Sequence, residues 1–231
     1  MAKIGEKENH RYSDAYVKQE MKMQLIDLSI KEFCDQLASD SPAPGGGSVA
    51  ALAGALSVAL CTMVTRLTIG KKKYEHIEAQ MKRLDGQAEA LLKDLLILVD
   101  KDTDAYNQVM AAVRLPRDGE DEKTSRKIAI EAANKKAARV PLNTLRTVAK
   151  LIPITSAVIK DGNANCITDA GVAVHLMHTA ALGAAYNVKI NLEGISDAGF
   201  VASAKAETDE LIGRISAAVR QQAASVEKAL E

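Results

Sequence analysis

The chain has 231 residues, of which 47% are hydrophobic and 26% charged, the balance of an ordinary globular domain with enough length for one large core. Thirty basic residues offset thirty acidic ones, so no overall field favours nucleic acid or an anionic membrane as a partner. Aromatic residues make up only 3%, too few for the base-stacking surfaces of proteins that bind single-stranded nucleic acids. The same composition favours close-packed helices over a sheet sandwich.

Residues 1–22 are polar and contain no apolar stretch, so we expect an N-terminal extension rather than a signal peptide, followed by one compact domain over residues 23–231. The longest apolar run, residues 49–64, has 16 residues and is shorter than a typical bilayer span, which predicts a buried helix and no membrane segment. Three scattered cysteines, Cys34, Cys61 and Cys166, without a Cys-x-x-Cys pair, fit reduced thiols in a cytoplasmic protein.

Helix signals follow one another along the chain. Ser29, with Glu32 three residues later, predicts a capping box at the start of a short helix. Further helices are expected over residues 48–69, 74–113, 123–151 with a kink at Pro141, 168–186, and from a cap at Ser196 or Asp197 to the C-terminus. Residues 187–197 are expected to form an irregular bridge. The predicted fold is all-α, a single-domain bundle of about five to seven helices, including long antiparallel ones.

The segment SPAPGGGS, residues 41–48, sets three glycines directly before an alanine-rich helix. It lacks the lysine of a P-loop and the preceding strand of a dinucleotide-binding turn. Its glycines let backbone N–H groups approach a ligand, and a helix N-terminus suits an anion or the polar edge of a heterocycle. The candidate ligand-binding residues here are Pro44, Gly45, Gly46, Gly47 and Ser48. The alternative is a tight turn before a core helix.

One carboxylate lies on the apolar side of the long third helix. A helical wheel places in one stripe Leu91, Leu95, Leu98, Val99, Tyr106, Val109 and Val113. Asp102 sits in the middle of this stripe, whereas Asp100 and Asp104 point away from it. Burial of a carboxylate is costly and raises its pKa, which suits proton transfer near neutral pH. The alternative is a structural aspartate that binds a helix end or an arginine.

Two further polar groups are candidates for ligand binding. Lys71, Lys72 and Lys73 follow the alanine-rich helix, where they either face solvent and favour the helix dipole or bind an anion. Asn163, Asn165 and Asp169 lie in a turn-rich segment, where they either bond to their own backbone or form a polar wall.

The histidines give no metal site. His175 and His178 lie three residues apart without a third ligand in range, so we expect no metal ion and leave both out of the site.

Several stretches resemble one known family. They are FCDQLASDSPAPGGGSVAALAGALSVALCTMVTRLTIGKKKYEH, VDKDTDAYNQVM, VPLNTLRTVAKL, GNANCITDAGVAV and GAAYNVKINLEGISD. Together they resemble the cyclodeaminase domain of formiminotransferase-cyclodeaminase and the free-standing methenyltetrahydrofolate cyclohydrolases of the same family. The likeness covers nearly all of the chain after Met23.

The resemblance implies a folate one-carbon enzyme with Asp102 as its catalytic residue and no metal or redox cofactor beyond the tetrahydrofolate substrate. It implies a homodimer, and a role for the three lysines in binding the glutamate tail of a folate that can be polyglutamylated. Because one helical domain fills the chain, we favour hydrolysis of 5,10-methenyltetrahydrofolate to 10-formyltetrahydrofolate. The alternatives are a formiminotetrahydrofolate cyclodeaminase and a non-enzymatic helical module for folate binding or oligomerisation.

Overall fold

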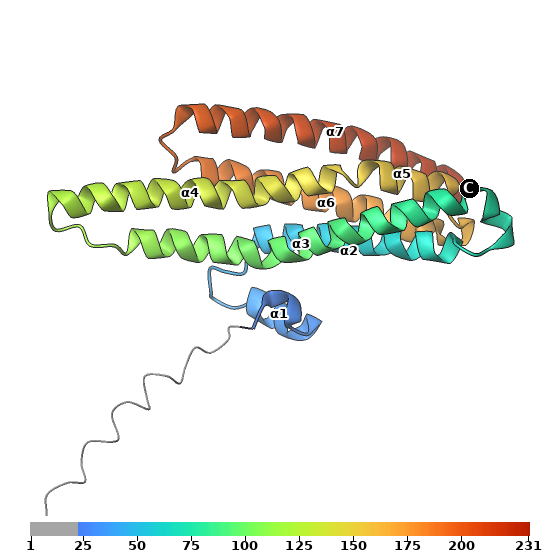
Figure 1. The fold of residues 1–231 in the computed structure, drawn as a ribbon, viewed down its shortest axis with the longest axis horizontal. Coiled ribbons are helices and arrows are strands. Elements are labelled where there is room, and N and C mark those ends of the chain that lie inside the picture. The colour runs from blue at the N-terminus through green and yellow to red at the C-terminus, as the bar shows by residue number, and fades with distance from the viewer. Residues whose placement is uncertain (1–22) are drawn as a thin grey trace, which may run out of the picture.

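The computed structural model describes residues 23–231, and the predicted extension over residues 1–22 lies outside them. The described chain consists of helices and contains no strand, so the all-α prediction is confirmed (Figure 1). The α-helices are α1 (Ile30–Leu37), α2 (Gly46–Thr68), α3 (Glu78–Val113), α4 (Glu120–Ala149), α5 (Ile152–Asp161), α6 (Ile167–Leu192) and α7 (Ala198–Leu230). Short 3-10 helices precede three of them, η1 (Leu25–Asp27), η2 (Lys72–Ile77) and η3 (Ala164–Cys166).

Helix α2 lies between α3 and α6 and runs antiparallel to both. Near its N-terminus the Ser48 hydroxyl donates to the Val99 carbonyl of α3 at 2.8 Å, and near its C-terminus the Thr65 hydroxyl donates to Asp85 at 3.2 Å. Residues early in α2 thus contact residues late in α3, and residues late in α2 contact residues early in α3. The two helices therefore run in opposite directions.

Small side chains bring α2 and α6 close together. A side chain on Gly183 of α6 would begin only 3.0 Å from the Ala50 Cβ of α2. About two helical turns further along α2, the Ser57 hydroxyl donates to the Ala173 carbonyl of α6 at 2.7 Å. The alanines and glycines of these helices therefore serve close helix packing, as their small size predicts.

Helix α4 closes a four-helix core by packing against α3 and α6, and α7 covers α6 and α4 from outside (Figure 1). The core is filled by aliphatic side chains and alanines, with Leu95, Leu145 and Met177 among those fully buried. Among the described helices, only α2 is long and apolar enough to cross a membrane, and 67% of its most apolar window is buried inside the bundle.

Both helix-start predictions are confirmed. Ser29 and Glu32 form the capping box of α1, and the Asp197 side chain accepts from the Phe200 N–H at the start of α7. Helix α4 continues through Pro141 and ends at Ala149, and the chain then starts the separate helix α5.

The predicted irregular bridge from residue 187 is wrong, because α6 continues to Leu192. The Asn187 side chain donates to the Gly183 carbonyl within the helix at 2.8 Å, and the Asn191 side chain donates to the Ala137 carbonyl of α4 at 2.9 Å. These two bonds satisfy asparagines that local propensity alone would assign to a turn. The glycine segment is also shorter than predicted, since α2 begins at Gly46 instead of Ser48.

Candidate active site

A cavity of about 390 Å³ lies where the N-terminus of α2 meets α3, α4 and α6. Among residues 23–231, Asp102 is the only carboxylate that lines it. The backbone of Gly45, Gly46 and Gly47 forms one wall, and apolar side chains including Val109 and Ile190 form another part. The cavity thus combines one acid–base group with both polar and apolar walls, a composition that suits a small polar molecule.

The Asp102 carboxylate is partly buried and faces the first turn of α2. The hydroxyl of Ser48 lies 3.4 Å from its Oδ2 atom and also donates to the Val99 carbonyl. Burial raises the pKa of the Asp102 carboxyl above its ordinary value, and hydrogen bonds from the backbone N–H and hydroxyl of Ser48 oppose part of that rise. A carboxylate with a raised pKa is a stronger base, and its pKa lies closer to neutral pH, where one group can both accept and donate a proton.

Gly47 is required by the position of this carboxylate. A Cβ atom at residue 47 would lie 2.5 Å from Asp102 Oδ2 and closer still to Oδ1, a separation that real Cβ atoms essentially never show. We predicted that the glycines let the backbone approach a ligand. Gly45 and Gly46 do line the cavity, whereas Gly47 also admits the Asp102 side chain. Pro44 is buried beside the lining and Ser48 lies behind the carboxylate.

Three asparagine side chains complete the cavity wall, and sequence reasoning missed them. They are Asn134 of α4 and Asn187 and Asn191 of α6. Each donates from its amide nitrogen to a backbone carbonyl, of Gly194, Gly183 and Ala137 respectively. These bonds hold the amides in place, where they can bind the polar edge of a ligand. The signal in the sequence was the i, i+4 pair of asparagines in NVKIN, which shares one helix face.

The other predicted residues gather at the opposite end of α2. The Asn163 backbone N–H donates to Thr68 at 2.9 Å and its side chain donates to the Leu67 carbonyl, so Asn163 binds the end of α2. Its side-chain oxygen also accepts from the Asn165 N–H at 3.2 Å, which is the local backbone bond we considered as the alternative. Asn165, Asp169 and the lysines 71–73 lie in or beside the same end. Because α2 has 23 residues, this end lies about 35 Å from the Asp102 cavity. Within one chain these residues do not join Asp102 around one small ligand.

A family model described as Formiminotransferase-cyclodeaminase matches residues 29–210. The chain belongs to this family. It is 39% identical over 189 residues to the methenyltetrahydrofolate cyclohydrolase of Methylorubrum extorquens, which covers 82% of this chain and 91% of that protein. It is 35% identical over 207 residues to the formimidoyltransferase-cyclodeaminase of Rattus norvegicus, where the match covers 90% of this chain but only 38% of the longer rat protein.

The family's fold is also confirmed by a solved structure. The crystal structure of formiminotetrahydrofolate cyclodeaminase from Thermotoga maritima superposes with a TM-score of 0.80 at 32% sequence identity, and covers 88% of this chain and 98% of that one. The resemblance recognised from the sequence motifs is therefore confirmed, and the relatives are enzymes of folate chemistry by name.

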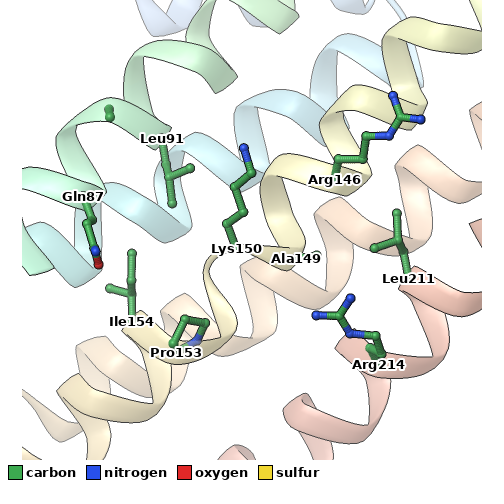
Figure 2. Close-up of a pocket in the computed structure, with 10 residues that line it drawn as sticks. Gln87, Leu91, Arg146, Ala149, Lys150, Pro153, Ile154, Leu211 and Arg214 are labelled. Atoms are coloured by element: carbon green, nitrogen blue, oxygen red, sulfur yellow. The ribbon is translucent and has the colours of Figure 1, made fainter. Parts of the chain in front are cut away.

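A larger cavity of about 600 Å³ lies elsewhere in this cyclodeaminase-family chain, between α3, the α4–α5 break and α7. Figure 2 shows Arg146, Lys150 and Arg214 among the side chains around it. Arg146 already binds the Glu207 carboxylate of α7, because its Nε and Nη2 atoms each donate to one carboxylate oxygen. The described residues that line it include no carboxylate, histidine or cysteine, so they offer no acid–base group of the kind that Asp102 provides.

Metal ligands do not gather anywhere in residues 23–231. No three histidine, cysteine, aspartate or glutamate side chains there lie close enough to hold one ion. His175 is exposed, and His178 lies 3.5 Å from the Ser216 hydroxyl of α7. All three cysteines are free in the structure.

Proposed function

We propose that this protein hydrolyses 5,10-methenyltetrahydrofolate to 10-formyltetrahydrofolate. The observation that carries the proposal is the Asp102 carboxylate, which is partly buried in a cavity of amides and apolar side chains. The 39% identity to a named methenyltetrahydrofolate cyclohydrolase over 91% of that protein supports the same reaction.

In the proposed reaction, water attacks the methenyl carbon between N5 and N10, and Asp102 accepts a proton from the water as the C–O bond forms. The hydroxyl of the tetrahedral intermediate then loses its proton, the C–N5 bond breaks, and N5 receives a proton that Asp102 carries. One water is consumed and one proton is released, since the substrate is a cation and the product is not. The ionised carboxylate, which is partly buried, also stabilises the cationic substrate.

The residues around Asp102 suit the remaining parts of a folate. The amides of Asn134, Asn187 and Asn191 offer hydrogen bonds to the polar edge of a pterin, and Val109 and Ile190 offer apolar contacts to its faces. The reaction forms a C–O bond and breaks a C–N bond without a change in oxidation state, and Asp102 carries the proton, so we propose that it needs no metal or redox cofactor. Full activity after dialysis against a chelator supports this, and loss that a divalent ion restores contradicts it.

The deciding experiment follows the absorbance of methenyltetrahydrofolate with purified protein and an Asp102→Asn variant. Decay of the added compound at a rate above the buffer blank, and dependent on Asp102, supports hydrolysis. If the rate with the wild-type protein does not exceed the buffer blank in this reaction or in the cyclodeamination described next, the catalytic proposal fails. The alternative, a non-enzymatic folate-binding module, is then favoured.

Cyclodeamination is the second candidate, because the Thermotoga maritima protein of the same fold carries that name. There N10 attacks the formimino carbon on N5 and ammonia leaves, which gives 5,10-methenyltetrahydrofolate. Both reactions pass through a tetrahedral carbon between two nitrogens and can use one carboxylate. Asp102-dependent appearance of the methenyl absorbance from formiminotetrahydrofolate, with release of ammonia, identifies this activity.

We also propose that the protein is a cytoplasmic homodimer. Three free thiols suit a reducing compartment. Light scattering coupled to size-exclusion chromatography measures the mass, and twice 24.7 kDa is the expected result.

A further inference from the structure

The cavity of about 600 Å³ between α3, the α4–α5 break and α7 has a preformed apolar wall. Leu91 of α3, Ile154 of α5 and Leu211 of α7 line it and are at most 8% exposed. All three belong to the hydrophobic core, where close packing fixes their positions. The volume lies within the range of small-molecule sites, which is about 300–1,000 Å³. The cavity therefore offers a fixed apolar surface to a small organic molecule.

Positive charge surrounds this apolar wall. Arg146, Lys150 and Arg214 all line the cavity, and Figure 2 shows the Arg214 guanidinium extending from α7 toward the α4–α5 break. Lys150 forms no ion pair with a carboxylate in residues 23–231. Arg214 approaches Glu210 only to 3.9 Å, and both side chains are exposed, so this pair contributes little. Two of the three cations are therefore available to a bound anion.

Arg146 differs from the other two cations because its charge is already balanced. Its Nε and Nη2 atoms donate to the Glu207 carboxylate, and its Nη1 atom donates to the Asn143 side-chain oxygen at 2.8 Å. These bonds hold Arg146 in place as part of the wall. The planar guanidinium of Arg214 can bind a carboxylate or phosphate through two parallel N–H groups, and the Lys150 ammonium adds a point charge. The cavity thus combines an excess of positive charge with an apolar wall.

We propose that this cavity binds a small amphipathic anion. Lys150 and Arg214 hold its carboxylate or phosphate group, and its aliphatic or aromatic body lies against the three buried aliphatic side chains. The site is separate from the candidate active site, because Leu91 and Asp102 are three helical turns apart on α3, about 16 Å. Its lining offers no acid–base group, so we assign it binding and not catalysis. The assignment does not depend on the proposed function.

Titration with 8-anilinonaphthalene-1-sulfonate tests the site, because this aromatic anion fluoresces strongly when it binds an apolar surface. A variant with both Lys150→Gln and Arg214→Gln should bind the probe at least about tenfold more weakly than the wild type. The matched control carries Lys93→Gln and Arg220→Gln, which remove the same charge from exposed positions outside the lining, and it should bind like the wild type. Thermal unfolding checks that each variant is folded. Equal binding by the first variant and the wild type overturns the proposal.

A second variant tests the location of the site and keeps both cations. Ala90 of α3 is exposed and lines the cavity, and glutamate favours a helix nearly as well as alanine does, so Ala90→Glu should fold normally. The new carboxylate repels an anion and neutralises the cations, so we expect at least about tenfold weaker binding of the probe. Ala111→Glu is the control, because Ala111 is exposed on the same helix but outside the lining. Unchanged binding by Ala90→Glu overturns the proposal.

Displacement of the probe from the wild-type protein tests the chemistry of the ligand. Octanoate or octyl phosphate should displace it at concentrations at least about tenfold lower than octanol or inorganic phosphate, which each lack one half of the amphipathic anion. The stronger of the two octyl anions identifies the preferred charged group. Octanol that displaces the probe as well as both anions do, or inorganic phosphate that does so, overturns the proposal. Methenyltetrahydrofolate turnover is a separate measurement, and its absence would reject the proposed function but not this site.

Discussion

Gly47→Ala tests whether the position of the Asp102 carboxylate controls the rate. The added methyl group would lie 2.5 Å from Oδ2, and ordinary contact begins at 3.4 Å, so the carboxylate has to move by roughly 1 Å. A displacement of this size lowers turnover by about 100-fold. The tight contact costs about 1–3 kcal/mol in the free energy of unfolding, and the better helix propensity of alanine offsets about 1 kcal/mol of it. We therefore expect a folded protein with strongly reduced kcat.

The assay is the decay of methenyltetrahydrofolate absorbance, with thermal unfolding measured on the same samples. Gly213→Ala is the matched control, because a Cβ atom at this position of α7 meets no atom within 4 Å. It should keep full activity and gain about 1 kcal/mol in stability. A folded Gly47→Ala protein with wild-type kcat would refute the role of the Asp102 geometry in the rate.

Three other predictions concern titration and reactivity. Asp102→Asn should lower kcat by about 10²–10⁴-fold and raise Tm. Folding raises the pKa of this carboxyl, so its ionised form destabilises the native state at neutral pH, and the amide removes that cost. A lower Tm contradicts this. Ser48→Ala should shift the acid limb of the kcat profile to higher pH, because the lost hydroxyl holds the pKa of Asp102 down; an unchanged limb speaks against Asp102 as the base. A thiol reagent should label Cys34 quickly and should label Cys61 and Cys166 only after unfolding. Both of these thiols are buried, and burial raises the pKa of Cys61 to about 12. Fast labelling of all three thiols in the folded protein would contradict the structure.

The fold class was predictable because its signals are local. Alanine-rich composition, capping residues and apolar periodicity act within a few residues of each other, and each favours a helix. The end of α6 was not predictable by the same means. Asn187 and Asn191 satisfy their amides within α6 and against α4, and the second bond exists only after the two helices have packed.

The candidate site residues also fall into those that the sequence could place and those that it could not. The lysines and Asn163 were grouped with Asp102 because they resemble parts of one family pattern, but the pattern does not state which end of a bundle each part occupies. The antiparallel packing of α2 with α3 and α6 determines that, and it separates the two groups along the length of α2. Asn134 could not be predicted from its neighbours in the sequence, because an asparagine in a charged helix is common. Only the packing of α4 against α6 places it in the cavity wall.

Asp102 differs from these residues because its anomaly belongs to one helix alone. A carboxylate in the middle of an apolar stripe is unfavourable whichever helix packs against it, so the wheel identifies it before any tertiary contact is known. The structure then supplies the reason that the fold tolerates it: Gly47 leaves room for its oxygens and Ser48 donates to them. The hydrogen bonds from the backbone N–H and hydroxyl of Ser48 do not cancel the cost of burial, and the carboxyl keeps a raised pKa. A residue whose stabilisation is left incomplete in this way retains the basicity that proton transfer requires, whereas a structural aspartate would be fully paired.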